Sequence, residues 1–536
     1  MSLRNLPKII LITGGDMNNI DKGIIPASIG VLLKANGYNI TVVKMDPCFN
    51  RNSINLDPSK YGEKYSLDDG EIVSINFGYY ERILGQIFTK HNYITRGKID
   101  DYVNNQNEIK YTGDKIRSVN VVAAILECLE KVFNQTIDDR NPNKPLPDIC
   151  IIELGGADNE ISDKKFLKAL SEFKEVKKNF IHIHISKLIC GKTGFLETSI
   201  KMFRKQNWLP ELIICRSENP ISDVFKKCLA KIADIEIEKV INLPEVSNIK
   251  SVAIILQEQN IYQIIAEKLQ LKNGPNFDEN ISKLKKDIEK ADSYTKVVKI
   301  ALVGKYFNHP CSSSLFLESY ESMVQQLKIA AADKKCSCKV EILFVRGQDL
   351  ENKDSDEMQK AQKLLEEANG ILIPGGLGSD GFEGLMKACK YARENKKPLL
   401  SICYGMQCAV IEFAQNIIGI HAGESYKKAL KKVNIEMPEN GNPRRGARTV
   451  TFLTKNSKLF ELYGCKPFIK ERNWNRMEIN PSLVPSYISA GLRFVAVGFD
   501  ENESGEISET LQNLMSRARI HDEVDEVIFF NIFKYI

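Results

Sequence analysis

Short apolar runs alternate with helix-like amphipathic stretches through the first half of the chain. Five of these runs are rich in isoleucine, leucine and valine: 8–13, 39–45, 148–154, 180–186 and 211–217. Such runs, separated by helices, are typical of strands that are buried on both faces of a parallel sheet. The pattern therefore predicts an α/β fold, in which residues 1–269 form a doubly wound parallel-sheet domain.

A second series of the same kind follows in the second half of the chain. Its predicted strands lie in 297–307, 339–345, 370–376, 397–405 and, at the end of the chain, 526–536. Residues 298–536 are therefore predicted to form a second doubly wound parallel-sheet domain. The polar residues 270–297 between the two series carry charges at helical spacing and are predicted to be a linker that contains a helix.

Length and charge are consistent with this division and narrow the choice of partners. A chain of 536 residues is too long for one ordinary core and suits two or three domains. The 74 basic and 69 acidic residues leave a net charge of only +5, so a nucleic-acid partner is not expected. No apolar run is long enough to span a bilayer, and the N-terminus lacks a signal-peptide pattern, so a cytoplasmic location without membrane attachment is expected.

Cysteine and histidine residues do not form a convincing metal site. The 13 cysteines are odd in number and have no disulfide-like spacing, which favours a reducing compartment. Cys336 and Cys338 are close together, but no second pair lies near them in sequence. His182 and His184 fall on one face of a predicted strand, and a buried strand is the favoured interpretation.

Lysines and carboxylates follow the first strands of the chain. The glycine-rich stretch 13–23 joins a strand to a helix, whose free N–H groups can hold an anion, and Lys22 adds a positive charge. Lys44 ends the second strand, Glu153 ends the third, and Asp69 lies between them in sequence. Because ligands gather at the carboxyl edge of a parallel sheet, these residues suit a triphosphate with magnesium.

Ordered motifs along the chain resemble the CTP synthase family. The stretches similar to its P-loop-like synthetase domain are 22–47, 78–83, 92–99, 151–156 and 212–217. The stretches similar to its class I glutamine amidotransferase domain are 303–307, 371–378, 381–385 and 391–416. The resemblance covers nearly the whole chain. It implies an enzyme that phosphorylates UTP with ATP and aminates it with ammonia, which is released from glutamine in the second domain.

The resemblance also assigns residues to a nucleotide site. It implies ATP, UTP and Mg²⁺ as ligands, with nucleotide contacts from Lys22, Lys44, Lys192 and Thr193 and metal contacts from Asp69 and Glu153. The chain departs from the family pattern at Asp21, where the family has glycine. Two like charges about 4 Å apart cost on the order of 4 kcal/mol at an effective dielectric of 20, so weak ATP binding is predicted.

The predicted UTP loop, residues 191–201, is also altered. Gly194 replaces the family's second lysine, and Glu197 replaces its glutamine. A carboxylate that faces the UTP phosphates would repel them.

In the second domain, Cys403 occupies the position of the family's nucleophile, at a strand-to-helix elbow. Such an elbow exposes the sulfur, and the helix N-terminus lowers the thiol pKa. Gly376, Gln407 and Arg476 correspond to residues that bind glutamine. Ser401 replaces the first glycine of the family's elbow.

A cysteine nucleophile needs a base, and the chain has lost the family's base. The C-terminal motif that supplies histidine and glutamate is absent, and the last strand places Asn531 and Phe533 at those two positions. Other departures are Asn473 and Asn475 in place of two histidines, and Lys427, beside the matching Ser425, in place of a glutamate. These losses predict that glutaminase activity is absent.

Three hypotheses follow from these observations. The first is a degenerate CTP synthase that keeps the two-domain fold and acts as a structural or regulatory part of an assembly. The assembly would be either a self-association, since the family forms tetramers and filaments, or a larger complex with other proteins. The second is a divergent ligase that is fed by free ammonia. The third, a fully active glutamine-dependent enzyme, requires a base that the sequence does not show. Losses in both sites favour the first hypothesis.

Overall fold

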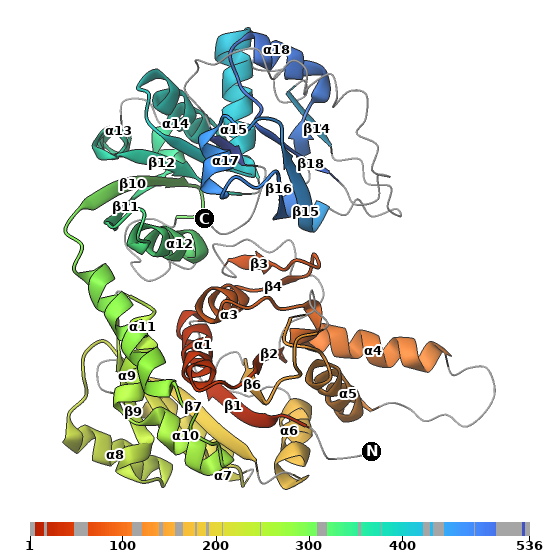
Figure 1. The fold of residues 1–536 in the computed structure, drawn as a ribbon, viewed down its shortest axis with the longest axis vertical. Helices are drawn as coiled ribbons and strands as arrows, with labels where there is room; N and C mark the ends of the chain where they lie inside the picture. Colours follow the sequence, from red (N-terminus) through yellow and green to blue (C-terminus); the bar gives the residue numbers. More distant parts are fainter. Residues whose placement is uncertain are drawn as a thin grey trace. The chain divides into compact units, whose positions relative to one another are not determined.

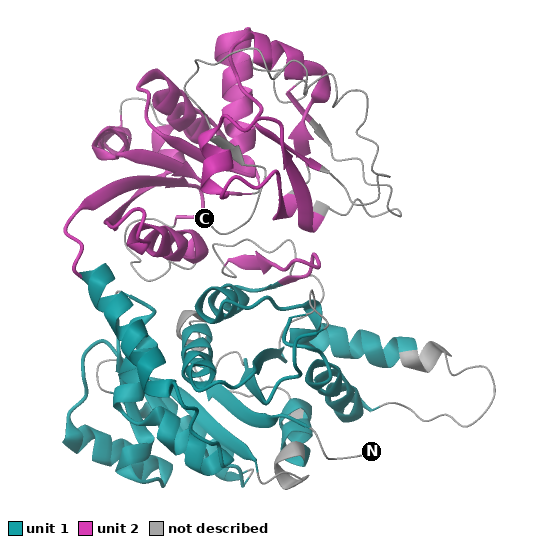
Figure 2. Ribbon diagram, viewed as in Figure 1, with its two compact units in different colours: residues 1–56, 73–292 teal, residues 57–72, 293–536 magenta. Residues whose placement is uncertain are grey.

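In a computed structural model the chain forms two compact units (Figure 2). The first unit contains residues 1–56 and 73–292, and the second contains 57–72 and 293–536. The structure describes residues 6–14, 19–47, 63–109, 120–138, 143–155, 164–176, 179–188, 192–205, 207–246, 248–307, 319–351, 355–376, 378–421, 429–432, 444–475, 477–499 and 528–530. Within this part of the chain, no helix is long and apolar enough to cross a bilayer.

The first unit is built on a seven-stranded sheet in which every strand pair is parallel (Figure 1). Its spatial order is β5 (Tyr93–Thr95), β2 (Ile40–Asp46), β6 (Ile149–Leu154), β1 (Lys8–Gly14), β7 (Phe180–Lys187), β8 (Leu212–Ser217) and β9 (Val240–Pro244). The five apolar runs of the first half are thus strands of one parallel sheet, and the α/β fold class is confirmed.

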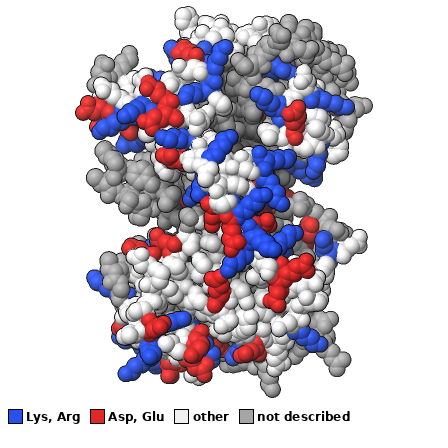
Figure 3. All heavy atoms as spheres, turned by 60° about the vertical axis from the view of Figure 1, so that its left-hand side comes forward, with Lys and Arg blue, Asp and Glu red and all other residues white. Residues whose placement is uncertain are grey.

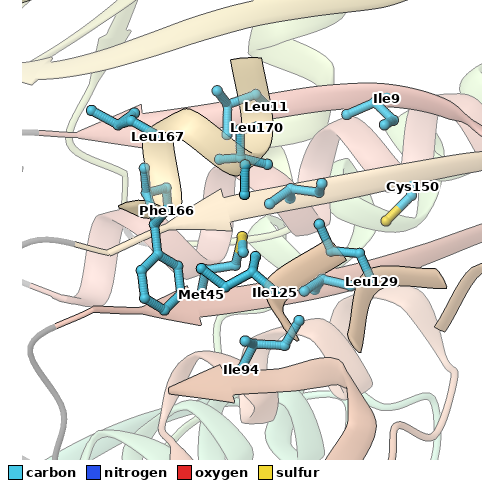
Figure 4. Close-up of a cluster of buried hydrophobic side chains, with 14 of the residues drawn as sticks. Ile9, Leu11, Met45, Ile94, Ile125, Leu129, Cys150, Phe166, Leu167 and Leu170 are labelled. Atoms are coloured by element: carbon cyan, nitrogen blue, oxygen red, sulfur yellow. The ribbon is translucent and has the colours of Figure 1, made fainter. Parts of the chain in front are cut away.

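Helices cover both faces of this sheet. They are α1 (Asn19–Ala35), α3 (Asn76–Leu84), α4 (Arg96–Ile109), α5 (Val121–Phe133), α6 (Lys164–Val176), α7 (Gly194–Lys205), α8 (Asp223–Ala233), α9 (Ser251–Glu258), α10 (Ile261–Leu269) and α11 (Phe277–Asp292). Side chains alternate between the two faces of a strand. Leu11 and Met45 therefore share a face with Cys150, and all three pack against α5 and α6 (Figure 4). On the opposite face, α1 contacts β2 and β6, and α3 packs against α1.

The winding of this sheet reverses at one point. The connection after β1 runs through α1 to β2, on one side of β1, whereas the connection after β6 runs through α6 to β7, on the other side. Because β1 and β6 are neighbours, the reversal lies between their carboxyl ends. Open parallel sheets bind ligands at such a position, so the fold directs attention to the residues that end β1, β2 and β6.

The second unit contains a parallel sheet of its own. Its order is β11 (Lys339–Arg346), β10 (Val297–Gly304), β12 (Gly370–Ile373), β13 (Leu399–Ile402) and β19 (Ile528–Phe530). Its helices are α12 (Glu321–Ala332), α13 (Asp356–Glu367), α14 (Phe382–Glu394), α15 (Tyr404–Phe413), α17 (Lys458–Leu462) and α18 (Val484–Ser489). The predicted final strand is present, since β19 pairs with β13.

Two smaller sheets complete the second unit. An antiparallel sheet has the order β16 (Phe468–Asn475), β15 (Arg444–Phe452) and β18 (Ala496–Phe499), and β14 (Leu430–Lys432) pairs with β17 (Met477–Ile479). The hairpin of β3 (Lys64–Ser66) and β4 (Ile72–Ser74) contains the boundary at residue 72. The predicted domain boundaries at 269 and 298 stay predictions.

Both units have a mixed charged surface. Basic and acidic side chains lie among one another on each unit on the face drawn in Figure 3. This is consistent with a net charge of only +5 over the whole chain.

Candidate functional site

Lys44 and Glu153 meet at the carboxyl edge of the first sheet. The two residues are register partners on the neighbouring strands β2 and β6. The Lys44 Nζ lies 2.5 Å from Glu153 Oε1, and each side chain is only 1% exposed. Two of the residues assigned to the nucleotide site are thus brought together, as a buried ion pair.

Two side chains from α3 complete the surroundings of Glu153. Asn76 Nδ2 donates a hydrogen bond of 2.7 Å to Glu153 Oε1, and the Tyr80 hydroxyl donates to Oε2. Sequence reasoning missed both residues. Tyr80 lies within the quoted motif at 78–83, but its role depends on how α3 packs against the sheet.

The neighbouring charges keep the Lys44 ammonium of this network protonated. Burial alone lowers the pKa of the Lys44 ammonium, but the charges of Glu153 and Asp46 outweigh it, and the net shift is upward. Burial, followed by the charge of Glu153, raises the pKa of Tyr80 well above its usual value. At neutral pH Lys44 is therefore an ammonium, and Tyr80 is a neutral hydroxyl donor.

This arrangement does not offer an open carboxylate to Mg²⁺. Glu153 already accepts hydrogen bonds from three side chains, so a metal ion would share the carboxylate with these donors. Among the described residues, no group of three or more histidine, cysteine, aspartate or glutamate side chains could hold a metal. Asp69 belongs to the second unit, so its pairing with Glu153 stays a prediction.

The phosphate loop itself falls mostly outside the described residues. Residues 15–18 are not described, and for Asp21 and Lys22 only the helical backbone is described. The predicted clash between Asp21 and a triphosphate therefore stays a prediction.

The predicted UTP loop leads into α7. Lys192 is exposed, and the Thr193 hydroxyl donates a hydrogen bond of 2.6 Å to Glu197 Oε1. Glu197 lies in the first turn of α7, where a negative charge is favoured by the helix dipole. The carboxylate that replaces the family's glutamine thus has a local partner.

His182 and His184 lie in a buried strand, as expected. Thr13 Oγ1 lies 2.8 Å from His182 Nε2 and 2.9 Å from His184 Nδ1. Both rings pack edge-on against Phe203 of α7. The pair is part of the core between β1, β7 and α7.

Cys403 forms the strand-to-helix elbow of the second unit. It lies between β13 and α15 with φ 53° and ψ −105°, a strained backbone that is typical of a nucleophile elbow. Its Sγ lies 3.7 Å from the carbonyl oxygen of Trp474 on β16, to which the thiol donates. The elbow geometry predicted from the sequence is present.

The expectation of a lowered thiol pKa at this elbow is wrong. Burial raises the pKa of the Cys403 thiol to about 12, although the N–H of Tyr404 acts in the opposite direction. Desolvation disfavours the thiolate more strongly than the helix N-terminus favours it. At neutral pH the sulfur is therefore a protonated thiol.

The glycines of the elbow have different roles. A Cβ at Gly405 would lie 2.3 Å from the carbonyl oxygen of Ile373, so α15 packs on β12 only with glycine there. Ser401, in contrast, is a buried residue of β13 paired with Ile373 and Phe529, and its φ is not positive. Replacing the family's first glycine with serine therefore leaves the turn intact.

The loop that precedes α14 is held by Lys305. The Lys305 ammonium donates 2.6 Å to the Gly378 carbonyl oxygen, and the Tyr404 hydroxyl donates 2.7 Å to the same atom. A Cβ at Gly376 would lie 2.8 Å from Lys305 Cδ. Gln407 is buried in α15. Gly376 and Gln407 thus lie in the same unit as Cys403, and their glutamine contacts stay predictions.

The described surroundings of Cys403 do not include a histidine base. Within the described part of the second unit the histidine is His421, which is exposed. Asn473 is buried and donates 3.0 Å to the carbonyl oxygen of Glu471. The side chains of the other residues predicted for this glutamine site are not described in the structure: Ser425, Lys427, Asn475, Arg476, Asn531 and Phe533.

Two family models match the chain. The model for CTP synthase N-terminus matches residues 8–271, and the model for Glutamine amidotransferase class-I matches residues 315–515. The chain is 35% identical to CTP synthase 2 of Homo sapiens over 516 residues, which cover 92% of this chain and 86% of that protein. It is 34% identical to CTP synthase 1 of Homo sapiens over 525 residues, which cover 94% and 87%.

Among solved structures, the chain is similar to the glutaminase domain of Trypanosoma brucei CTPS with bound acivicin. The identity is 28%, and the match covers 38% of this chain and 75% of that chain with a TM-score of 0.32.

Proposed function

The chain belongs to the CTP synthase family, and from that premise we propose that it is a catalytically degenerate member that works through its folded surface. In this proposal it is a structural or regulatory component of an assembly. The observation that carries the proposal is the environment of Cys403, whose thiol is buried, has its pKa raised by that burial, and donates to a backbone carbonyl.

Glutamine hydrolysis needs a thiolate and a group that protonates the leaving amine. Burial opposes the thiolate, and asparagine stands where the family has histidine, at Asn473 by sequence and, by alignment of the last strand, at Asn531. Asparagine does not titrate near neutral pH. The elbow is therefore retained as a backbone shape without the groups that would make it reactive.

The first unit supports the same proposal in a different way. The family uses ATP, for which Mg²⁺ is the expected counter-ion, and Lys44 and Glu153 are the residues that should meet them. Here the two side chains are bonded to each other and to Asn76 and Tyr80. A nucleotide must compete with these existing hydrogen bonds, which weakens binding.

The alternative is a divergent ligase that makes CTP from UTP, ATP and free ammonia or glutamine. One observation favours it, namely that Lys44 and Glu153 are still adjacent beside the reversal of the sheet's winding. A ligand that supplies new partners to both side chains could open the pair. The altered loops at Asp21 and Glu197 count against this alternative.

The test is CTP formation by the purified chain with ATP, Mg²⁺, UTP and either glutamine or ammonium, beside an active CTP synthase. The proposal expects no CTP from either nitrogen source. CTP from ammonium, with or without CTP from glutamine, would overturn the proposal and support the alternative. Asp21→Gly is the matched variant, because it restores the family's glycine and should tighten ATP binding if the rest of the loop survives.

A surface role also requires partners. The family expectation is self-association, and a larger complex is the other candidate. Light scattering after size-exclusion chromatography should find an oligomer or a co-purifying partner. A strictly monomeric protein without a partner would contradict this part of the proposal.

A further inference from the structure

The turn that joins α17 to β16 in the second unit displays apolar side chains to the solvent. Leu462, at the end of α17, is 71% exposed, and Phe468, at the start of β16, is 65% exposed. Among the large exposed apolar side chains of the described residues, these are the only two that lie within ten residues of each other. Single apolar residues are normal on a protein surface, whereas a group of them marks a contact site.

Hydrogen bonds fix the backbone of this turn. The N–H of Cys465 donates 2.9 Å to the Phe460 carbonyl oxygen, and Gly464, with φ +69°, supplies the left-handed residue that closes the end of α17. At the other end of the turn, the N–H of Phe452 donates 2.9 Å to the Pro467 carbonyl oxygen. A partner would therefore bind a turn that is already ordered, which lowers the entropic cost of binding.

A small apolar core supports the turn. Three buried side chains form this core, and two partly buried ones pack against it: Phe452, Leu459, Phe460, Tyr463 and Ile469. Because successive side chains of a strand point to opposite faces, Phe468 and Lys470 lie on the other face of β16 from Ile469. Both are exposed, so the strand presents an aromatic ring beside an ammonium group.

The charges around the two apolar side chains are mainly positive. Residues 455–470 contain four exposed lysines and one exposed glutamate: Lys455, Lys458, Lys466, Lys470 and Glu461. Over the whole chain the two signs nearly balance, with 74 basic and 69 acidic residues, so the excess is a local one. An apolar centre with a basic rim is complementary to a partner that carries an apolar side chain among acidic residues.

A second copy of the chain fits this surface poorly. In a two-fold symmetric dimer the same patch lies on both subunits, so the lysines of one copy would face the lysines of the other. Like charges that meet across an interface disfavour the contact. The occupant is therefore expected to be a different polypeptide of opposite charge.

We propose that residues 455–470 form a docking surface for an acidic polypeptide segment, whose apolar side chain lies against Leu462 and Phe468. The inference rests on the proposed function, because a protein that acts through contacts needs such a surface. It adds the place of the contact and the chemistry of the partner.

The test uses a thiol that lies within the surface. Cys465 is exposed in the turn, and Cys228 is exposed on α8 of the first unit. Iodoacetamide modification of both is followed by peptide mass spectrometry on the full-length protein, with increasing amounts of poly(Glu,Tyr), an acidic copolymer that contains aromatic side chains. The copolymer should slow the modification of Cys465 by about fivefold or more, because a bound segment excludes the reagent, and should leave Cys228 unchanged.

Two variants separate the apolar centre from the basic rim. Phe468→Ser should raise the copolymer concentration for half-maximal protection by about tenfold or more, since the apolar contact is lost. Lys455→Glu with Lys466→Glu should do the same, because the rim then repels the copolymer. The matched control is Lys360→Glu with Lys363→Glu, an exposed pair on α13 of the same unit, and it should leave the protection unchanged.

The buried Cys408 of the second unit reports that each variant is folded, since it should stay unmodified in all of them. Absence of protection by the copolymer would overturn the proposal. Equal protection by polyglutamate would also overturn it, because the apolar residues would then contribute nothing.

Two further results would assign the surface to another occupant and so contradict the proposal. One is protection by phosphatidylserine vesicles without protection by the copolymer, and the other is protection that rises with the concentration of the protein alone. None of these measurements uses CTP formation. A surface that fails the test therefore leaves the proposed function to be decided by the CTP assay.

Discussion

The two candidate sites of this molecule occupy equivalent places in their sheets but retain different chemical groups. Each lies at the carboxyl edge of a parallel sheet, where a strand gives way to a loop or helix. At the first, Lys44 and Glu153 keep their charges and satisfy each other. At the second, Cys403 keeps the strained elbow, and its thiol donates to a backbone carbonyl oxygen.

The difference shows that backbone shape and site chemistry depend on different parts of the sequence. The elbow is maintained by packing, since Gly405 allows α15 to touch β12. Its reactivity depends on a few polar partners, whose loss costs the fold little. At the first site the charged groups are themselves part of the core, so they cannot be lost singly without a large penalty.

Breaking the first site should therefore have the largest effect on stability. Lys44→Met leaves the Glu153 carboxylate buried without its counter-charge, which is expected to lower the free energy of unfolding by about 3–5 kcal/mol. The double variant Lys44→Met with Glu153→Leu should cost clearly less, because no charge remains unpaired. Urea unfolding of the three proteins measures both values.

The contribution of the Lys44–Glu153 pair to the free energy of unfolding should depend on pH with a definite sign. The pKa of Lys44 is raised from 10.5, so its contribution is fully present below pH 10.5 and is lost only as pH rises through the higher folded value. A Lys44→Met variant about as stable as the parent protein would contradict a structural role for the pair.

The second site should differ in reactivity instead. A thiol pKa raised from 9.0 to about 12 lowers the thiolate fraction near pH 8 about a thousandfold, and burial slows access further. Iodoacetamide at that pH should modify the exposed Cys228 and Cys465 long before Cys403. Peptide mass spectrometry over time follows each site, and early modification of Cys403 would refute the inert elbow.

The smallest effect is expected where serine replaced glycine. Ser401 lies in β13 with an ordinary φ, so Ser401→Gly should change the free energy of unfolding by no more than about 1 kcal/mol. It should also fail to create glutaminase activity, because the missing group is a base and not a turn. Thermal unfolding measures the stability change, and a glutamate assay measures the activity. A gain of glutaminase activity in Ser401→Gly would show that the backbone shape of the elbow was limiting.

Much of this comparison could be predicted from the sequence. Near-continuous apolar runs predicted the strands, and the observed β1 and β6 differ from the predicted runs by one residue at an end. Lys44 and Glu153 could be expected to meet because both end parallel strands of one sheet. The elbow at Cys403 followed from its glycine and the adjacent apolar strand.

Other features depend on tertiary packing that a linear pattern does not encode. Asn76 and Tyr80 reach Glu153 only because α3 packs against α1 and so lies beside the end of β6. The thiol pKa of Cys403 depends on burial beneath β16, a strand whose mixed polar sequence, Phe468–Asn475, gives little periodic signal. The grouping of residues 57–72 with the second unit involves contacts between positions far apart in sequence, such as 68 and 472.

The central claim, that the fold is kept while the glutaminase chemistry is lost, is tested most directly by glutamate release from glutamine. The purified chain and its Cys403→Ala variant are incubated with glutamine, ATP, Mg²⁺ and UTP, and glutamate is quantified. The account predicts that the parent protein releases no more glutamate than the variant. Release by the parent protein that Cys403→Ala abolishes would contradict the account, because it would require a thiolate and a base at this elbow.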